Sequence, residues 1–347
     1  MTEDFGTLPT GDKTTLYIIE NGGVTAAISD FGATLVRLLV PDVYGCVADV
    51  VLGYDNCLGY LKSNACFGGT IGRNANRIHK ARFTYCDTEY ILAANNGEHN
   101  LHSGPDYFHK RLWKLKNHSK NSVKFELISP HEDQGFPGNA LIQVAYELDR
   151  DGSLHILYEG ISDQDTVFNL TNHSYFNLAG HEHTDRAMTQ ILTIQGNSFC
   201  PTDSDGIPTG ELRPVDGTPM DFRTPKPILQ DIDADYEPLR LQSGYDHNWV
   251  VHSNPCAVLE DPASGRRMEI HSDCPGIQVY TPGAMHEFGK NGVHYGKRSG
   301  VALETQYYPD ALHNPAWPQP ITKAGQHYTS ETVLRFNNRL IPDIKKL

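Results

Sequence analysis

Residues 141–158 read LIQVAYELDRDGSLHILY. Two runs rich in β-forming residues, Leu141 to Leu148 and Leu154 to Tyr158, flank a polar segment from Asp149 to Ser153 with Asp-Gly at its tip. Two such runs joined by a short Asp-Gly segment predict a β-hairpin. The stretch therefore predicts a pair of antiparallel strands.

The same pattern continues toward both ends of the chain. Further strand-like runs cover residues 14–19, 24–28, 34–40, 123–127, 257–259, 268–270 and 332–336, with Gly, Pro, Asn or Asp between them. Helical turns are predicted only near residues 57–61 and 228–232. Many short strands without βαβ alternation predict an all-β fold, an antiparallel sandwich or barrel. Because no repeat or linker-like tract interrupts the pattern, we expect a single domain over residues 1–347.

The composition is that of a soluble globular protein with an acidic surface. Hydrophobic residues make up 39% of the chain and charged residues 20%. The net charge is -13, from 42 acidic and 29 basic residues. Such a surface repels nucleic acid and anionic membranes, and no Lys/Arg run offsets it. No apolar run approaches the ~20 residues that a membrane span needs. We therefore expect neither a nucleic-acid nor a membrane partner.

The cysteines and the N-terminus predict a cytoplasmic protein. The cysteines are scattered without a CxxC pair, as expected for free thiols in a reducing compartment. They are Cys46, Cys57, Cys66, Cys86, Cys200, Cys256 and Cys274. The first residues are acidic and lack the basic and apolar blocks of a signal peptide.

Two polar segments in the first third of the chain are candidate site elements. Residues 72–78 read GRNANRI. They form either a solvated loop with two surface arginines or a site in which Asn76 and Arg77 donate hydrogen bonds to hydroxyl oxygens, which suits a guanidinium fork. His99 and His102 follow, but in a β protein this spacing places them on opposite faces. Without an acidic or Cys partner at ligand spacing we expect no metal, and His102 is either a site histidine or a structural one.

Two further segments carry titratable groups suited to proton transfer. In residues 171–178, TNHSYFNL, one strand face can present His173 and Tyr175, and histidine exchanges protons near neutral pH. The alternative for His173 is a satisfied core histidine. The neighbouring segment His181 to His183 is expected at the surface. Glu304 follows an apolar run, and if it points inward, burial raises its pKa and makes it a better base near pH 7. If it points outward, it is a solvated residue at the end of a strand.

The segments resemble, together and in this order, the aldose 1-epimerase (galactose mutarotase) family. The matching stretches are GRNANRI (72–78), NLHSG (100–104), DQGFPGN (133–139), TNHSYFNLAG (171–180), GYDHNW (244–249), PGIQVYT (275–281) and ALETQYYPDALHNPAWP (302–318). They span most of the chain, and TNHSYFNL and LETQYYPD are the most specific. The resemblance implies a single large antiparallel β-sandwich of the galactose mutarotase-like (supersandwich) type. It also implies an open sugar cleft and no cofactor or metal.

The resemblance also implies residue roles for the interconversion of the α and β anomers of free hexoses such as D-glucose and D-galactose. Glu304 is the expected general base and His173 the general acid. The expected substrate-binding residues are Asn76, Arg77, His102, Tyr175, Asp246 and Gln278. Proton exchange in both directions suits a glutamate with a raised pKa and a histidine near its ordinary ~6.5.

Two stretches depart from the family pattern. Ser103 stands where the family commonly has glycine, and we expect this change to be tolerated. Pro282-Gly283 follows Thr281 where many members have a different sequence, and we expect it to alter the cleft wall and hence the sugar preference.

Three other functions use similar features. A hexose-6-phosphate 1-epimerase would need basic residues at the cleft mouth, and the acidic composition gives no sign of them. A glycosidase normally needs two carboxylates flanking the bond. A non-catalytic sugar-binding protein would need no matched acid and base. We expect a small-molecule hexose as the only partner of a monomer or homodimer.

Overall fold

The computed structural model describes residues 1–338. Its largest element is a nine-stranded antiparallel sheet. In spatial order the strands are β11 (Lys114–His118), β12 (Ser122–Ser129), β13 (Ala140–Leu148), β14 (Leu154–Ser162), β30 (Tyr328–Phe336), β24 (Arg267–Ser272), β23 (Ala257–Glu260), β18 (Ile191–Ile194) and β21 (Lys226–Pro227). The hairpin predicted around Asp-Gly is β13–β14, in which Leu148 pairs with Leu154.

Two smaller sheets accompany the nine-stranded sheet. One has five strands in chain order: β1 (Thr2–Thr7), β2 (Lys13–Asn21), β3 (Val24–Ser29), β4 (Thr34–Pro41) and β5 (Val47–Asp49). The other has six strands in the order β17 (Tyr175–Phe176), β28 (Val301–Gln306), β25 (Gly276–Tyr280), β22 (Asp246–Val250), β19 (Ser198–Cys200) and β20 (Arg213–Pro214). The six-stranded sheet brings together segments that lie far apart in the sequence.

Short pairs and short helices complete the described fold. The two-stranded pairs are β7 (Arg77–Ile78) with β10 (Asn100–Leu101), β6 (Thr70–Ile71) with β16 (Thr171–Asn172), β15 (Thr166–Val167) with β29 (Ile321–Thr322), β8 (Arg82–Tyr85) with β9 (Thr88–Ile91), and β26 (Glu287–Phe288) with β27 (His294–Tyr295). The α-helices are α1 (Cys57–Lys62) and α2 (Glu237–Gln242). The 3₁₀ turns are His79–Ala81, Phe108–Lys110, Asp133–Gly135, Ala187–Thr189, Ile228–Gln230, Lys290–Gly292 and Ala311–His313.

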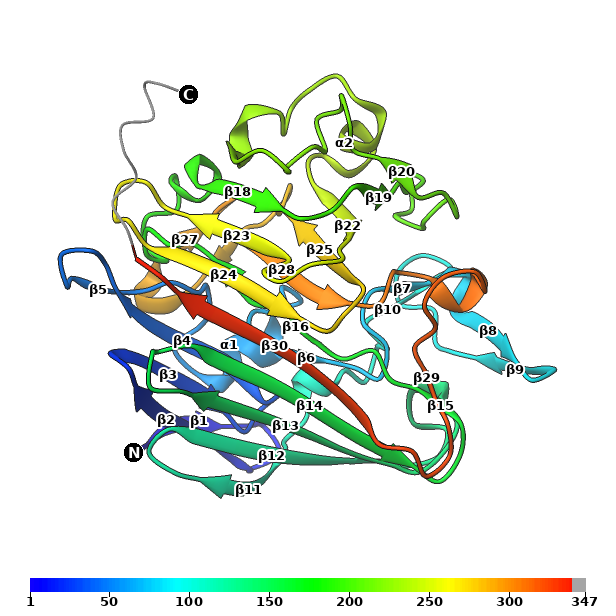
Figure 1. Ribbon diagram of the computed structural model, residues 1–347. Coiled ribbons are helices and arrows are strands. Elements are labelled where there is room, and N and C mark those ends of the chain that lie inside the picture. The colour runs from blue at the N-terminus through cyan, green and yellow to red at the C-terminus, as the bar shows by residue number, and fades with distance from the viewer. Residues whose placement is uncertain (339–347) are drawn as a thin grey trace.

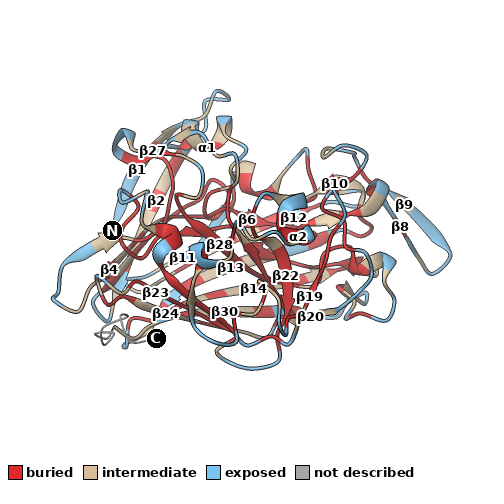
Figure 2. Cartoon of the chain, turned by 90° about the horizontal axis from the view of Figure 1, so that it is seen from above, coloured by how far each residue is buried: buried red, intermediate tan, exposed pale blue. Residues whose placement is uncertain are grey.

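One apolar core joins the three sheets. In Figure 1 the nine-stranded sheet forms a continuous layer, with the N-terminal strands packed beside one half and β19, β22, β25 and β28 beside the other. Buried side chains from every sheet share one cluster, among them Ile28 and Leu38, Val144 and Ile156, and Trp249 and Ile277. Figure 2 shows central strands such as β22 and β28 largely buried and the β8–β9 hairpin exposed at the edge. The predicted all-β sandwich is confirmed.

Local sequence signals account for several element ends. Asn21 pairs with Val24, so Gly22 and Gly23 alone form the turn, and their φ values of 57° and 81° are the left-handed ones that glycine favours. The helical turn predicted near Cys57 is α1, and the Asn56 side chain caps it by accepting from the N–H groups of Leu58 and Gly59. The described part of the chain has no helix that is long and apolar enough to cross a membrane.

A buried lysine ties the β26–β27 hairpin to the five-stranded sheet. Lys290, at the turn of the hairpin, is 4% exposed. Its ammonium group donates to the Asp49 carboxylate at 2.6 Å and to the carbonyls of Val36 and Val51 at 2.9 and 2.6 Å. A buried charge is tolerated when it is paired and fully hydrogen-bonded, as here. The hairpin therefore has a fixed place relative to the N-terminal strands.

Candidate active site

The six-stranded sheet sets the positions of the titratable groups by its register. On β28, Glu304 pairs with Gln278 of β25, and Ala302 pairs with both Tyr280 and Tyr175. On β22, Asp246 pairs with Tyr280. Since residues two apart share a face, Gln278 and Tyr280 lie on the same face of β25. These strands place Glu304, Gln278 and Asp246 side by side.

Glu304 points inward, as the sequence analysis required for a base. The residue is 2% exposed, and its Oε2 atom has no hydrogen-bond partner among the described residues. Burial raises the pKa of its carboxyl well above 4.5, and the negative charge of Asp246 adds to the rise while Arg77 opposes it. The predicted direction of the Glu304 pKa shift is confirmed.

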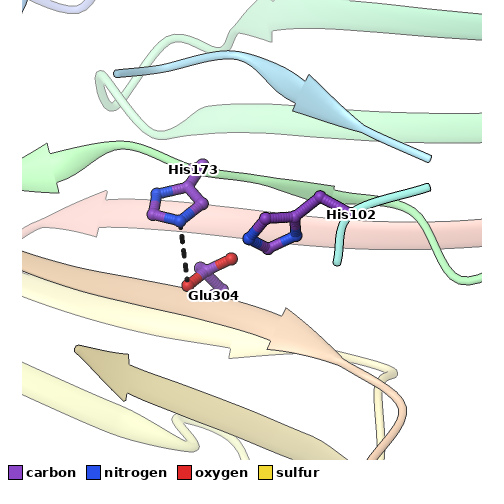
Figure 3. Close-up of side chains that lie close together, drawn as sticks. All are labelled: His102, His173 and Glu304. Atoms are coloured by element: carbon purple, nitrogen blue, oxygen red, sulfur yellow. Dashed lines mark ion pairs between the residues drawn. The ribbon is translucent and has the colours of Figure 1, made fainter. Parts of the chain in front are cut away.

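His173 lies opposite Glu304 at the break between β16 and β17. Its backbone N–H donates to the Gly69 carbonyl, and its carbonyl accepts from Gly68, whose φ of +62° favours glycine. The His173 Nε2 atom is 3.6 Å from Glu304 Oε1 (Figure 3). The ring stacks on Tyr175 with centroids 5.1 Å apart. Backbone and ring contacts thus hold the imidazole against the carboxylate.

The expected pKa of His173 is wrong. Burial lowers it to about 4 instead of leaving it near 6.5, because removal from water disfavours the imidazolium. His173 Nδ1 has no hydrogen-bond partner among the described residues. Burial by itself therefore favours a neutral imidazole beside a protonated Glu304.

His102 is held in one tautomer by the backbone of a neighbouring loop. The Asn76 N–H donates to His102 Nδ1 at 3.1 Å, and the His102 N–H donates to the Asn76 carbonyl at 3.0 Å. Burial lowers the pKa of His102 well below 6.5, so the ring is neutral. Because Nδ1 accepts, the ring proton lies on Nε2, which is a hydrogen-bond donor.

The same tautomer bears on metal binding. Ligand atoms of His102, His173 and Glu304 lie within 4.8 Å of one another, close enough for a metal ion (Figure 3). A metal needs a lone pair on each ligand atom. His102 Nε2 carries the proton and Nδ1 is engaged by Asn76, so His102 fits a donor to a hydroxyl better than a ligand. Two ligands would remain, fewer than the three of ordinary catalytic zinc sites.

A second polar group surrounds Asp246. Gln278 Nε2 donates to Asp246 Oδ1 at 2.6 Å, and Arg77 Nη1 is 3.7 Å from Asp246 Oδ2. Arg77 also donates through Nε to Asn96 at 3.2 Å. Each oxygen of the Asp246 carboxylate thus has one polar neighbour and keeps acceptor capacity for a ligand hydroxyl.

These groups line one cavity of about 550 Å³. Every predicted site residue lies in its wall except Gln278, which is 2% exposed and supports Asp246. We call the strand-borne side chains Tyr175, Asp246, Tyr280 and Glu304 the floor of the cavity. We call the loop segments 64–66 and 282–287 its rim; Gly283 alone of these residues does not line the cavity.

Several residues of the cavity lining were not predicted from the sequence. Tyr280 could have been found, because it lies two residues from Gln278 on the same strand face. Cys66 and His109, which are 3.5 Å apart from Sγ to Nε2, and Glu287 reach the cavity from loops or short elements, and no periodicity marks them. Burial raises the pKa of the Cys66 thiol to about 12.

The structure also tests the expected positions of Arg73, His181 and Ser103. Arg73 is not a surface arginine but is fully buried, donating to the Pro137 and Ser129 carbonyls among others. His181 is also buried and contacts Tyr295 Oη at 2.8 Å, so its expected surface position is wrong. Ser103 has a φ of +56° and exchanges hydrogen bonds with the backbone of Asn74, which explains how the chain holds serine where glycine is common.

Comparisons with known proteins identify the family of the chain and agree with the fold. The profile of the aldose 1-epimerase family matches residues 15–335. The galactose mutarotase of Bos taurus is 38% identical over 340 residues, covering 96% of this chain and 97% of that protein. The aldose 1-epimerase of Haemophilus influenzae is 37% identical over 338 residues, covering 94% and 97%.

Solved structures extend the agreement. A GalM/aldose epimerase homologue from C. elegans superposes with a TM-score of 0.86 at 31% identity, covering 93% of this chain and 98% of that one. A galactose 1-epimerase from Lactobacillus acidophilus, at 24% identity and a TM-score of 0.85, shares the fold over 97% of this chain and 98% of its own. The match in fold and in sequence extends over nearly the whole chain, and the chain therefore belongs to the aldose 1-epimerase family.

Proposed function

We propose that the chain interconverts the α and β anomers of free hexoses through proton exchange with Glu304 and His173. The observation that carries this proposal is the buried pair itself, with 3.6 Å between His173 Nε2 and Glu304 Oε1 in the cavity wall. The C1 hydroxyl and the ring oxygen of a pyranose are both bonded to C1. A base and an acid this close together can therefore reach both oxygens of one sugar.

The chemistry follows from these positions. Glu304 takes the proton of the C1 hydroxyl while His173 protonates the ring oxygen, and the C1–ring-oxygen bond breaks to give an aldehyde. Rotation about C1–C2 presents the other carbonyl face, and closure returns both protons with the roles reversed. His102 Nε2–H, Asn76, Arg77 and Asp246 hold the remaining hydroxyls, and Tyr175 packs beside His173.

The pair has to hold one proton between its two members. A proton on Glu304 with a neutral His173, and a carboxylate with an imidazolium, contain the same number of protons and differ only in placement. Burial by itself favours the first arrangement. We propose that a bound sugar favours the second, because its C1 hydroxyl donates to the carboxylate and its ring oxygen accepts from the imidazolium.

The cavity suits an uncharged sugar. Its lining holds the carboxyl groups of Asp246, Glu287 and Glu304 against one permanent cation, Arg77. A hexose 6-phosphate would bring a dianion into this wall, so we place the 6-phosphate epimerase second. A glycosidase is less well supported, since the Asp246 carboxylate is occupied by Gln278 and the partner of Glu304 is a histidine.

Polarimetry tests the proposal. Freshly dissolved α-D-glucose or α-D-galactose should approach its equilibrium rotation faster with the protein than without it. A sugar-binding protein without catalysis would bind these sugars, as seen by calorimetry, and leave the rate of mutarotation unchanged. That result would favour the binding function over the enzymatic one.

We further propose that the chain acts in the cytoplasm without a cofactor, as one domain and as a monomer or homodimer, with a small-molecule hexose as its partner. All seven cysteines are free, which suits a reducing compartment. The net charge of -13 opposes binding to nucleic acid. Light scattering of the protein as it elutes from a size-exclusion column would distinguish the monomer from the dimer.

A further inference from the structure

Glu287 brings a carboxylate to the rim of the cavity from outside the family motifs. It begins β26, and its side chain lines the cavity together with Met285 and His286. It contacts neither Glu304 nor the Arg77–Asp246–Gln278 group. Glu287 is therefore a second acidic feature of the same cavity, separate from the proton-exchanging pair.

The carboxylate is fixed in place by hydroxyl donors. Tyr54 Oη donates to Glu287 Oε2 at 2.8 Å, and Ser63 Oγ donates to Oε1 at 3.1 Å. Ser63 itself accepts from the Ala65 N–H, so the bond connects the two rim segments. Three residues further along the chain, Lys290 anchors the hairpin to Asp49. Glu287 is thus preorganised without a cation beside it.

The remaining hydrogen-bonding capacity of Glu287 matches a hydroxyl group. An ionised carboxylate has about four acceptor positions and no donor. Two are used by Tyr54 and Ser63, and the side chain is only half-buried in the cavity wall. A sugar hydroxyl can donate to a free position, whereas a carboxylate or phosphate on the sugar cannot donate and is repelled.

We propose that Glu287 selects neutral aldoses by accepting a sugar hydroxyl and repelling anionic sugars such as uronates and sugar phosphates. This inference rests on the proposed function, because it assumes that the cavity holds an aldose. It gives the rim a role in specificity that is distinct from proton exchange. The Glu304–His173 pair with its one proton is neutral overall, so the lining carries the charges of Asp246 and Glu287 against the single permanent cation Arg77, which points the same way.

D-Galactose and D-galacturonate test the proposal, because they differ only at C6, where a carboxylate replaces the hydroxymethyl group. Polarimetry from each crystalline α anomer at pH 7 gives kcat/KM for both. The ratio of galactose to galacturonate should be high in the parent and should fall roughly tenfold in Glu287→Gln, as expected for removal of one charge several ångströms away in a partly wet site. Glu182→Gln, which removes an exposed carboxylate outside the cavity lining, should keep the parental ratio.

Tyr54→Phe separates charge from position. It keeps the carboxylate but removes one of its two fixing donors, so it should raise KM for galactose while the ratio stays high. A folded Glu287→Gln protein with the parental ratio and the parental thermal midpoint would overturn the role of Glu287 alone. A parent that does not accelerate galactose mutarotation at all would overturn the proposed function, and this inference with it.

Discussion

The floor and the rim of the cavity are built in different ways. The floor residues Tyr175, Asp246, Tyr280 and Glu304 lie on paired strands of one sheet, where register fixes each side chain relative to the next. The rim segments 64–66 and 282–287 are largely loops, held by the contacts of Glu287 and Lys290. Glu304, the proposed base, lies on this floor, where paired strands give the more precise placement. The rim can vary without disturbing it.

The largest effect should come from the proton-exchanging pair. Glu304→Gln keeps the shape but cannot accept a proton as a carboxylate does, and His173→Asn cannot deliver one. Each should lower kcat by about 10²–10⁴-fold, as is typical for a lost general acid or base. The double variant should be far less impaired than the product of the single effects, because the two residues act as one unit.

Thermal unfolding must first show that these variants are folded. Polarimetry with α-D-glucose then gives kcat and KM. A folded Glu304→Gln protein with nearly parental kcat would remove the proposed mechanism and return attention to a sugar-binding function.

Asp246→Ala should weaken binding and not proton exchange. Losing a buried charge-assisted hydrogen bond costs about 1.5–3 kcal/mol. This corresponds to a rise in KM of roughly tenfold to hundredfold. Asp205→Ala, which removes an exposed aspartate outside this cavity, is the matched control and should leave both KM and kcat unchanged. A collapse of kcat at constant KM would place Asp246 in the proton-exchange step.

The pH dependence of stability should differ in sign between the two members of the pair. Folding raises the Glu304 pKa above 4.5, so its stabilising contribution is complete below that value and is lost as pH rises through the folded pKa. Folding lowers the His173 pKa from 6.5 to about 4, so stability is lost as pH falls through that window.

Thermal midpoints of the parent and both variants between pH 4 and pH 9 check this prediction. Relative to the parent, Glu304→Gln should gain stability as pH rises above about 4.5, and His173→Asn should gain as pH falls from 6.5 toward 4. Differences that stay constant across pH would mean that neither pKa is shifted by folding.

The smallest effect should come from an apolar rim residue. Met285→Ala removes part of an apolar contact with the sugar, worth about 0.5–1 kcal/mol, so KM should rise roughly two- to fivefold with kcat unchanged. Leu229→Ala, an exposed site outside the cavity lining, is the control. A change in kcat as large as that of Glu304→Gln would contradict the claim that the rim contributes to binding and not to proton exchange.

The same distinction explains what the sequence could predict. Strand alternation and Gly-rich turns predicted the antiparallel fold, and the motif stretches predicted Glu304, Asp246 and Gln278 as site residues. The pKa of His173 could not be predicted, because its burial depends on packing against Tyr175 and the 68–69 segment. Cys66, His109 and Glu287 could not be predicted either. They lie in loops or short elements, where no periodicity indicates the direction of a side chain.

The anchor of Lys290 has a consequence for proteolysis and truncation. The cavity lining begins at Asn64, so the first 63 residues contribute no side chain to it. Yet Asp49 and the carbonyls of Val36 and Val51 hold the buried ammonium of the rim hairpin. Removing one partner of a buried ion pair costs about 3–5 kcal/mol. A nick or deletion in the N-terminal strands would therefore release the β26–β27 hairpin and destabilise the rim of the cavity, although every residue that lines the cavity would still be present.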